Sequence, residues 1–155
     1  GFPIFTQKRP GLKNKIFILY KFKTLYDPKK NVSEKNRQNK VGDFLRKTGL
    51  DELPQLFNIL ENNMSFIGPR PLLVEYLEKY SNYEKKRHLV KPGITGLAQV
   101  YPSPSGKKSW KNSIKLDIYY TSKLSFFLDM KIIFKTIKII LLRKKQYKDF
   151  KKFYE

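Results

Sequence analysis

The chain has 155 residues, enough for one domain with a modest core, and its 33 lysines and arginines against 13 acidic residues give a net charge of +20. Such an excess of positive charge indicates an anionic partner: nucleic acid, an acidic membrane surface or phosphorylated substrates. The absence of cysteine excludes disulfides, thiol nucleophiles and cysteine-bound zinc, and a single histidine, His88, excludes a histidine-rich metal site.

The sequence begins at Gly1, and it shows neither a signal-peptide pattern nor an apolar run of the roughly 20 residues that a membrane-spanning helix needs. Because no methionine stands at the start, we expect the chain to be a fragment that lacks a preceding segment. No internal repeat is present. We therefore expect one domain over residues 1–155, with residues 143–155 as a basic tail.

The first forty residues predict a β-hairpin followed by a polar loop. Residues 16–25 are rich in β-forming side chains and predict a strand, which pairs with residues 4–6 inside a proline-containing segment of loop or short strand. Residues 27–40 are polar and charged and contain almost no apolar side chains, so they predict a loop.

Three helices are predicted between residues 53 and 120. Apolar side chains recur with helical spacing over residues 53–60, and Asp51 is placed to begin this helix. Residues 72–88 predict a second helix of mixed charge, and residues 110–120 predict a third. Turns and loops rich in glycine, proline or serine separate these elements, at residues 65–71, 90–100 and 101–108.

The most apolar segment, residues 124–142, predicts an amphipathic helix. A basic helix with a bulky apolar face suits the plane of a membrane interface, whereas an ordinary amphipathic helix would pack that face on the core. The segment alone leaves both interpretations open. The apolar stripe consists of Phe126, Met130, Ile133, Phe134, Ile137 and Leu141, and the lysines opposite are Lys131, Lys135 and Lys138.

Two adjacent carboxylates, Asp51 and Glu52, are the first candidates for chemistry. Such a pair can bind one divalent cation, or it can divide into a nucleophile and a metal ligand. The alternative is structural, because aspartate is a favoured N-cap and glutamate suits the first turn of a helix. Taken without other information, the position favours the capping interpretation.

Arg70 lies between Pro69 and Pro71, which restrict the backbone and would hold the planar guanidinium in place for a phosphate. The alternative is an ordinary surface turn. Lys21 and Arg46 are further candidates for phosphate contact, although most basic side chains in such a chain are solvated.

These features occur together in stretches that resemble the bacterial sugar transferase family, the monotopic phosphoglycosyl transferases, and among them the small Campylobacter-type enzyme. The resemblance covers residues 3–142 in unbroken order, but the family's N-terminal re-entrant membrane helix is missing here. The matching stretches are FTQKRPGLKNKIFILYKFKTL, LRKTGLDELPQLFNILENNMSFIGPRPLLVEYL, KRHLVKPGITGLAQV, LDIYY and LSFFLDMKIIF.

The resemblance implies a role for each candidate residue. Asp51 corresponds to the family's nucleophile, and Glu52 serves with it in a Mg²⁺ site. Arg70 corresponds to a phosphate-binding arginine. The same polar site includes Arg46 and Lys21, and Asp117 is expected on its substrate or metal side.

The resemblance also implies the reaction and its location. Sugar 1-phosphate would pass from a UDP-sugar to a polyprenol phosphate through a covalent aspartyl intermediate, releasing UMP and starting a surface glycan or glycoconjugate. The anionic cytoplasmic face of the bacterial inner membrane suits the charge of the chain. We expect an α+β, mostly helical single domain with a small β-hairpin and amphipathic helices at the membrane interface.

Two other classes of function compete with this interpretation. A basic RNA- or DNA-binding module would explain the charge and the 15% of aromatic residues. Against it, the sequence shows no helix-turn-helix, RNP or zinc-finger pattern. A non-catalytic scaffold at the membrane surface is the third possibility, and the intact pair of carboxylates argues against it.

Overall fold

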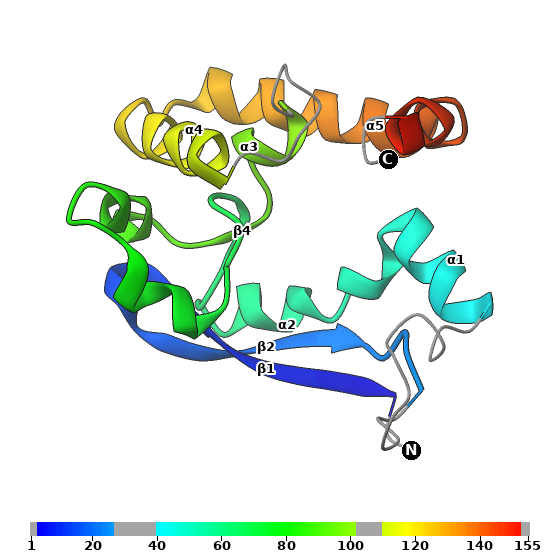
Figure 1. Ribbon diagram of the computed structural model, residues 1–155, viewed down its shortest axis with the longest axis horizontal. Coiled ribbons are helices and arrows are strands. Elements are labelled where there is room, and N and C mark those ends of the chain that lie inside the picture. Colours follow the sequence, from blue (N-terminus) through cyan, green and yellow to red (C-terminus); the bar gives the residue numbers. More distant parts are fainter. Residues whose placement is uncertain (1–2, 27–39, 102–109, 153–155) are drawn as a thin grey trace.

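The computed structural model describes residues 3–26, 40–101 and 110–152, with backbone alone for residues 143–152. It is α+β, as predicted: helices predominate, and the described strands form two sheets of two strands each. Most of the predicted loop over residues 27–40 and nearly all of the loop over residues 101–108 lie outside the described residues. Figure 1 shows two layers: the β-hairpin lies in the lower layer, and the long C-terminal helix lies in the upper layer.

The lower layer begins with the predicted hairpin. Strands β1 (Ile4–Pro10) and β2 (Ile16–Phe22) pair in antiparallel register, from Ile4 opposite Phe22 to Pro10 opposite Ile16. One face of β2 buries Phe17 and Leu19 against Met64. The hairpin is thus longer in β1 than the sequence predicted, because the pairing continues to the proline at its turn.

Helix α2 (Gln55–Leu60) lies along the hairpin (Figure 1) and is fixed there by one buried amide. The side chain of Asn58 accepts a hydrogen bond from the backbone N–H of Tyr20 at 3.1 Å and donates one to the carbonyl of Ile18 at 2.6 Å. Since Asn58 is fully buried, both of its polar groups need these partners. The helix is therefore held in register with β2.

The segment that precedes α2 differs from the prediction. Helix α1 (Lys40–Thr48), which the sequence did not predict, ends at Gly49. Gly49 adopts a left-handed conformation (φ 76°), and a 3-10 turn over Leu50–Glu52 follows it. Asp51 lies within this turn and not at the N-cap of α2, a position that Pro54 occupies without a side-chain cap. The capping interpretation of Asp51 is therefore wrong.

The predicted helix over residues 72–88 is also wrong, because two short 3-10 segments, Val74–Lys79 and Glu84–Leu89, take its place. The break lies at Ser81, whose backbone N–H and hydroxyl both donate to Glu84 while the backbone of Glu84 donates back to the hydroxyl. This reciprocal pattern starts a new helical segment and thereby interrupts a continuous helix.

A parallel strand pair joins the two layers. Strand β3 (Ser65–Ile67) pairs with β4 (Gly93–Thr95), where the sequence predicted a turn and a glycine loop. The glycine allows this approach, since a Cβ at Gly93 would lie 2.1 Å from the backbone nitrogen of Gly68. Helix α3 (Leu97–Val100) follows directly and leads into the upper layer.

The upper layer consists of α4 (Trp110–Ser122), α5 (Phe126–Lys152) and α3. The helix predicted over residues 110–120 is confirmed as α4. Between the helices and the strand pair lies the largest apolar cluster, built by Ile67, Leu97, Val100, Tyr120 and Ile132.

Helix α5 has an apolar surface on two sides. Its core side is formed by Ile132, which is fully buried, with Leu128, Ile133 and Ile139 packed against the same cluster. The predicted stripe lies mostly on the outside, with Phe126 71%, Phe134 69% and Leu141 76% exposed. Within the described ranges, no helix is both long and apolar enough to cross a membrane.

Candidate active site

Glu52 is the centre of a small network of charges. Its Oε1 accepts a hydrogen bond from Nζ of Lys21 at 2.8 Å and one from Nη2 of Arg70 at 2.7 Å. Lys21 comes from β2, Arg70 comes from the loop after β3, and Glu52 comes from the 3-10 turn before α2. The structure thus brings together three of the residues predicted for the site, from three segments of the chain.

The two neighbouring carboxylates differ in their electrostatic surroundings. Burial acts to raise the pKa of Glu52, but the charges and hydrogen bonds of Arg70 and Lys21 lower it below its usual value. For Asp51, burial and then the charge of Glu52 raise the pKa, and the weaker influence of Lys21 and Arg70 does not reverse the shift. In the described part of the chain, no ion pair engages Asp51. The charge of Glu52 is therefore balanced by two directly bonded cations, whereas Asp51 is influenced by the same cations only weakly.

Backbone restraints explain why Asp51 and Glu52 lie beside the hairpin. The left-handed Gly49 turns the chain out of α1, and the backbone N–H of Glu52 closes the 3-10 turn onto the carbonyl of Gly49 at 3.2 Å. Asn58 then fixes α2 on β2, the strand that provides Lys21. The position of the carboxylates thus depends on restraints at both ends of the turn.

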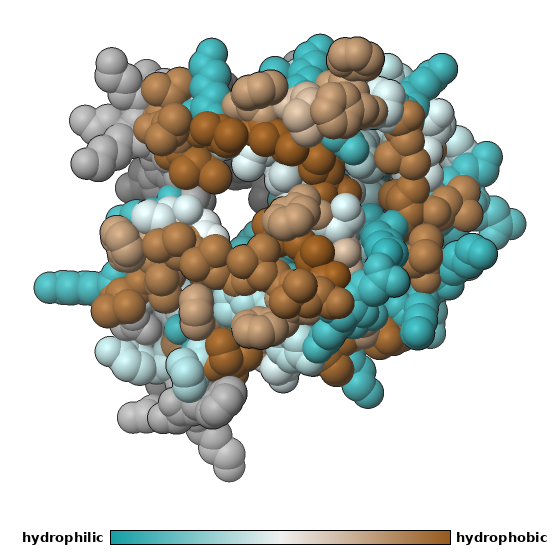
Figure 2. Space-filling view, turned by 180° about the vertical axis from the view of Figure 1, so that it is seen from behind, coloured by the Kyte–Doolittle hydropathy of each residue, from teal (hydrophilic) through white to brown (hydrophobic). Residues whose placement is uncertain are grey.

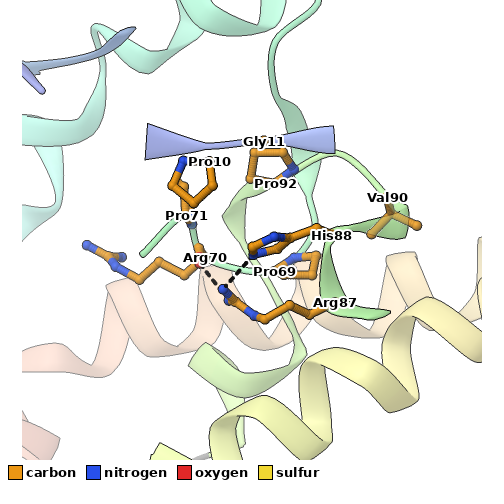
Figure 3. A pocket seen from close by; sticks show the side chains of 9 residues that line it. All are labelled: Pro10, Gly11, Pro69, Arg70, Pro71, Arg87, His88, Val90 and Pro92. Carbon is orange, nitrogen blue, oxygen red and sulfur yellow. Dashed lines mark hydrogen bonds between the residues drawn. The ribbon is translucent and has the colours of Figure 1, made fainter. Parts of the chain in front are cut away.

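Arg70 is positioned by a second arginine, Arg87, which is 1% exposed. Nη2 of Arg87 donates to the backbone carbonyl of Arg70 at 2.7 Å. Figure 3 shows Arg87 against the backbone of the proline-rich loop, whereas the guanidinium of Arg70 points away from the pocket that these residues line. Arg70, whose side chain binds Glu52, is therefore held at its backbone carbonyl by the buried cation of Arg87.

Asp117 of α4 neutralises this buried cation. Its Oδ2 accepts hydrogen bonds from Nε of Arg87 at 3.0 Å and from Nη2 at 2.6 Å. Burial raises the pKa of Asp117, while Arg87 acts in the opposite direction. Asp117 is thus connected to Arg70 through Arg87, and a direct contact with substrate or metal stays a prediction.

Arg46, the remaining predicted site residue, lies on α1 and forms a half-exposed ion pair with Asp43 at 2.6 Å. The structure does not pair it with Asp51 or Glu52. His88, next to Arg87, is buried between Arg87 and Asn14, and burial followed by the charge of Arg87 lowers its pKa to about 4. A neutral, enclosed imidazole is suited to packing and not to binding an anion.

Sequence reasoning missed Arg87 and also Arg9 on β1, whose Nη1 donates to the carbonyl of Pro71 at 3.2 Å. Both are among the 33 lysines and arginines of the chain, and their local sequence does not show which of these side chains are enclosed. A buried cation is identified by its partners, and those partners are distant in the sequence. The only available signal was their place within the stretches that resemble a family.

The acidic residues at the site could hold one metal ion with help from a substrate. No cluster of three or more histidine, cysteine or acidic side chains occurs among the residues that the structure describes. Asp51 has an unpaired carboxylate, and both bonds to Glu52 end on Oε1, which leaves Oε2 available. Mg²⁺ often takes one or two carboxylates together with water and substrate phosphates, so this donor set fits it.

Comparison with known proteins gives a consistent result. The family model described as "Bacterial sugar transferase" matches residues 1–143. The "Uncharacterized sugar transferase EpsL" of Bacillus subtilis is 44% identical over 149 residues, which are 92% of this chain and 72% of that protein.

Two further relatives are named for different sugars. The "Galactosyl transferase CpsE" of Streptococcus agalactiae is 38% identical over 92% of this chain. The "UDP-glucose:undecaprenyl-phosphate glucose-1-phosphate transferase" of Klebsiella pneumoniae is 42% identical over 86% of it. The chain spans only 35% and 31% of the length of these two proteins.

The buried ion pair predicts a large effect on stability. We expect Asp117→Asn to lower the free energy of unfolding by about 3–5 kcal/mol, because the charge of Arg87 would stay buried without its carboxylate partner. Asp43→Asn is the matched control: it breaks the half-exposed pair with Arg46 and should cost at most about 1 kcal/mol. Urea denaturation measures both values. Equal, small effects would show that Asp117 does not compensate Arg87.

Proposed function

The chain belongs to the bacterial sugar transferase family, and we propose that it is a phosphoglycosyl transferase that moves a sugar 1-phosphate from a UDP-sugar to a polyprenol phosphate and releases UMP. The observation that supports this most directly is the unequal environment of Asp51 and Glu52. One carboxylate is held by two cations, and the other is free to react.

Asp51 is the proposed nucleophile. A carboxylate whose pKa is raised and which lacks a cationic partner is more basic than usual, and it does not have to break an ion pair in order to react. Glu52 cannot fill this role equally well, because Lys21 and Arg70 share its charge. The pair therefore divides into a reactive and a supporting member.

The reaction balances in two displacements at one phosphorus. In the first, an oxygen of Asp51 forms a bond to the phosphorus that bears the sugar, the bond from that phosphorus to the bridging oxygen breaks, and UMP leaves. In the second, a phosphate oxygen of the polyprenol phosphate attacks the same phosphorus, and the bond to Asp51 breaks. The carboxylate is regenerated, and the product is a polyprenyl diphosphate sugar.

Arg70 and Lys21 are proposed to stabilise the charge on the phosphates during both steps. Arg70 is the better placed of the two, because its side chain is about half exposed while its backbone is held by Arg87. A planar guanidinium can contact two phosphate oxygens at once. Arg46 and Asp117 are proposed members of the wider site, Arg46 on the side of α1 and Asp117 through Arg87.

Asp51 and Oε2 of Glu52 are the proposed ligands of Mg²⁺. When bound, the ion would neutralise charge on the diphosphate and so favour departure of UMP. Asp51 can serve both as ligand and as nucleophile only if its two oxygens are used separately. No ion pair with another described residue occupies this carboxylate, which supports such a division.

We propose that the protein acts on the cytoplasmic face of the bacterial inner membrane, where a polyprenol phosphate presents its headgroup. Leu50 and Leu53 flank the two carboxylates and are exposed, and the exposed face of α2 continues with Leu56, Phe57 and Leu60. Figure 2 shows apolar surface both where α1 and α2 lie and along α5. Apolar side chains beside a phosphate-processing site suit an acceptor that is held in lipid.

The nucleophile assignment predicts a covalent adduct. Incubation with a panel of UDP-hexoses, without acceptor, should add the mass of a hexose phosphate to the peptide that contains Asp51, as measured by mass spectrometry. Asp51→Asn should abolish the adduct and turnover, since an amide does not form the acyl phosphate. Glu78→Gln, at an exposed acidic residue outside the proposed site, is the control and should keep both. Turnover near the wild-type level in Asp51→Asn would remove Asp51 from this role.

The metal assignment predicts loss of activity on chelation. EDTA should abolish UMP release, and added Mg²⁺ should restore it. Calorimetry in the presence of UMP gives a measurement that does not need turnover: Asp51→Asn should weaken Mg²⁺ binding, and the exposed-site control Glu78→Gln should leave it unchanged. Full activity in EDTA would contradict the proposal.

The exposed stripe of α5 predicts binding to anionic vesicles. Replacing Phe126, Phe134 and Leu141 with serine should reduce flotation with vesicles at high salt, where the electrostatic contribution is screened. The control replaces three exposed side chains outside α1, α2 and α5, namely Tyr83, Leu89 and Tyr119. A nucleic-acid-binding module would instead bind RNA with a steep salt dependence and would not respond to the stripe. Equal flotation of the folded stripe variant and its parent at high salt would refute an interfacial role.

A further inference from the structure

A second polar pocket lies beside Glu52, between the hairpin and the proline-rich loop. Its polar side chains are Arg9, Lys21, Gln55 and Arg70, and Pro71 and Ile94 contribute to its walls. Lys21 and Arg70 already belong to the proposed active site. Arg9 does not, and the proposed reaction has so far given it no role.

The pocket holds more positive than negative charge. Lys21 and Arg70 both bind the single oxygen Oε1 of Glu52. In the described part of the chain, no carboxylate lies within ion-pair distance of Arg9. Burial, and then the charge of Arg70, lower the pKa of Arg9, and the weaker effect of Glu75 only partly opposes this. Arg9 is therefore held near Arg70 without a carboxylate of its own, while Arg70 shares Glu52 with Lys21.

Arg9 is fixed in place but has unused donors. Its Nη1 donates to the carbonyl of Pro71 at 3.2 Å, and its Nη2 donates to Oε1 of Gln7 at 2.6 Å. Its Nε is buried and has no partner among the described residues. Since a guanidinium has five N–H groups, two of these are used and three remain. The contact with Pro71 ties Arg9 to the loop that presents Arg70.

The two-step reaction requires one phosphate position to be used twice. A displacement at phosphorus places the attacking and leaving groups in line on opposite sides. Asp51 occupies one side in both steps, so UMP in the first step and the polyprenol phosphate in the second must occupy the other. A single cationic subsite opposite Asp51 would serve both.

We propose that Arg9, together with Arg70, forms this shared phosphate subsite, which binds the phosphate of UMP in the first step and that of the polyprenol phosphate in the second. The inference rests on the proposed function and adds a binding residue to it. Arg9 binds the phosphate that leaves in the first step and the phosphate that enters in the second. Glu52 and Lys21 lie on the other side of the reacting phosphorus, next to Asp51.

Calorimetric titration of the purified protein with UMP and with uridine tests this assignment without turnover. Arg9→Gln should weaken UMP binding by about 10- to 100-fold, the loss typical of a charge-assisted hydrogen bond, and should leave uridine binding unchanged. Lys8→Gln is the matched control, because it removes the same charge from the preceding residue of β1, whose side chain is exposed. An equal loss for UMP and uridine, or none for UMP, would overturn the proposal.

Arg9→Lys covers the case in which Arg9→Gln does not fold. It keeps the charge but loses the planar donors, so it should give a smaller loss of UMP affinity than Arg9→Gln and a thermal unfolding midpoint near that of the parent. Unchanged UMP affinity in a folded Arg9→Lys would contradict a bonded contact between guanidinium and phosphate.

Competition distinguishes the two sources of phosphate. A short-chain prenyl phosphate should displace UMP competitively from the parent protein, and Arg9→Gln should weaken both ligands by a similar factor. Simultaneous binding of the two ligands would overturn the shared subsite. Failure of the parent protein to bind UMP at all would refute the proposed function itself, which separates that outcome from a failure specific to Arg9.

Discussion

The enclosed guanidinium of Arg87 is the constraint on which the arrangement of the site depends. A cation removed from water is tolerated only when its donors are satisfied, and here the partners include residues of other elements. They are Asp117 of α4, the hydroxyl of Tyr80, the ring of His88 and the backbone carbonyl of Arg70. The upper layer and the proline-rich loop are therefore held to the same side chain. The backbone of Arg70, the proposed phosphate-binding arginine, is thereby held in place.

The placement of the two cations, Lys21 and Arg70, explains how two adjacent carboxylates acquire different properties. Neighbouring acids disfavour each other's ionisation, and the fold resolves this by giving both cations to Glu52. Asp51 keeps its charge without a partner and has a raised pKa. The difference does not arise from the two residue types, since it depends on β2 and the loop after β3 meeting at the 3-10 turn.

Local patterns in the sequence predicted the hairpin, α4 and the apolar character of residues 124–142. They failed where tertiary contacts decide the structure. The parallel pairing of β3 and β4 depends on a close approach of Gly93 to Gly68, which no periodicity predicts. The outer stripe of α5 was visible as a pattern, but a helix with apolar residues on two sides does not indicate which side meets the core. Asp51, Glu52 and Arg70 were predicted as site residues from the sequence, and the structure pairs Arg70 with Glu52, whereas the local sequence did not single out Arg87.

The β3–β4 pair also bears on how the protein folds. The two strands are short and parallel, and all of residues 68–92, which include Arg70 and Arg87, lie between them. Closing such a long loop loses chain entropy before the two three-residue strands return any stabilisation, so the pairing is expected to form late. The loop that bears Arg70 cannot reach its final place before β4 has been made. During synthesis on the ribosome, the proposed active site would therefore be assembled only after β4 has emerged, although Asp51 and Glu52 emerge earlier.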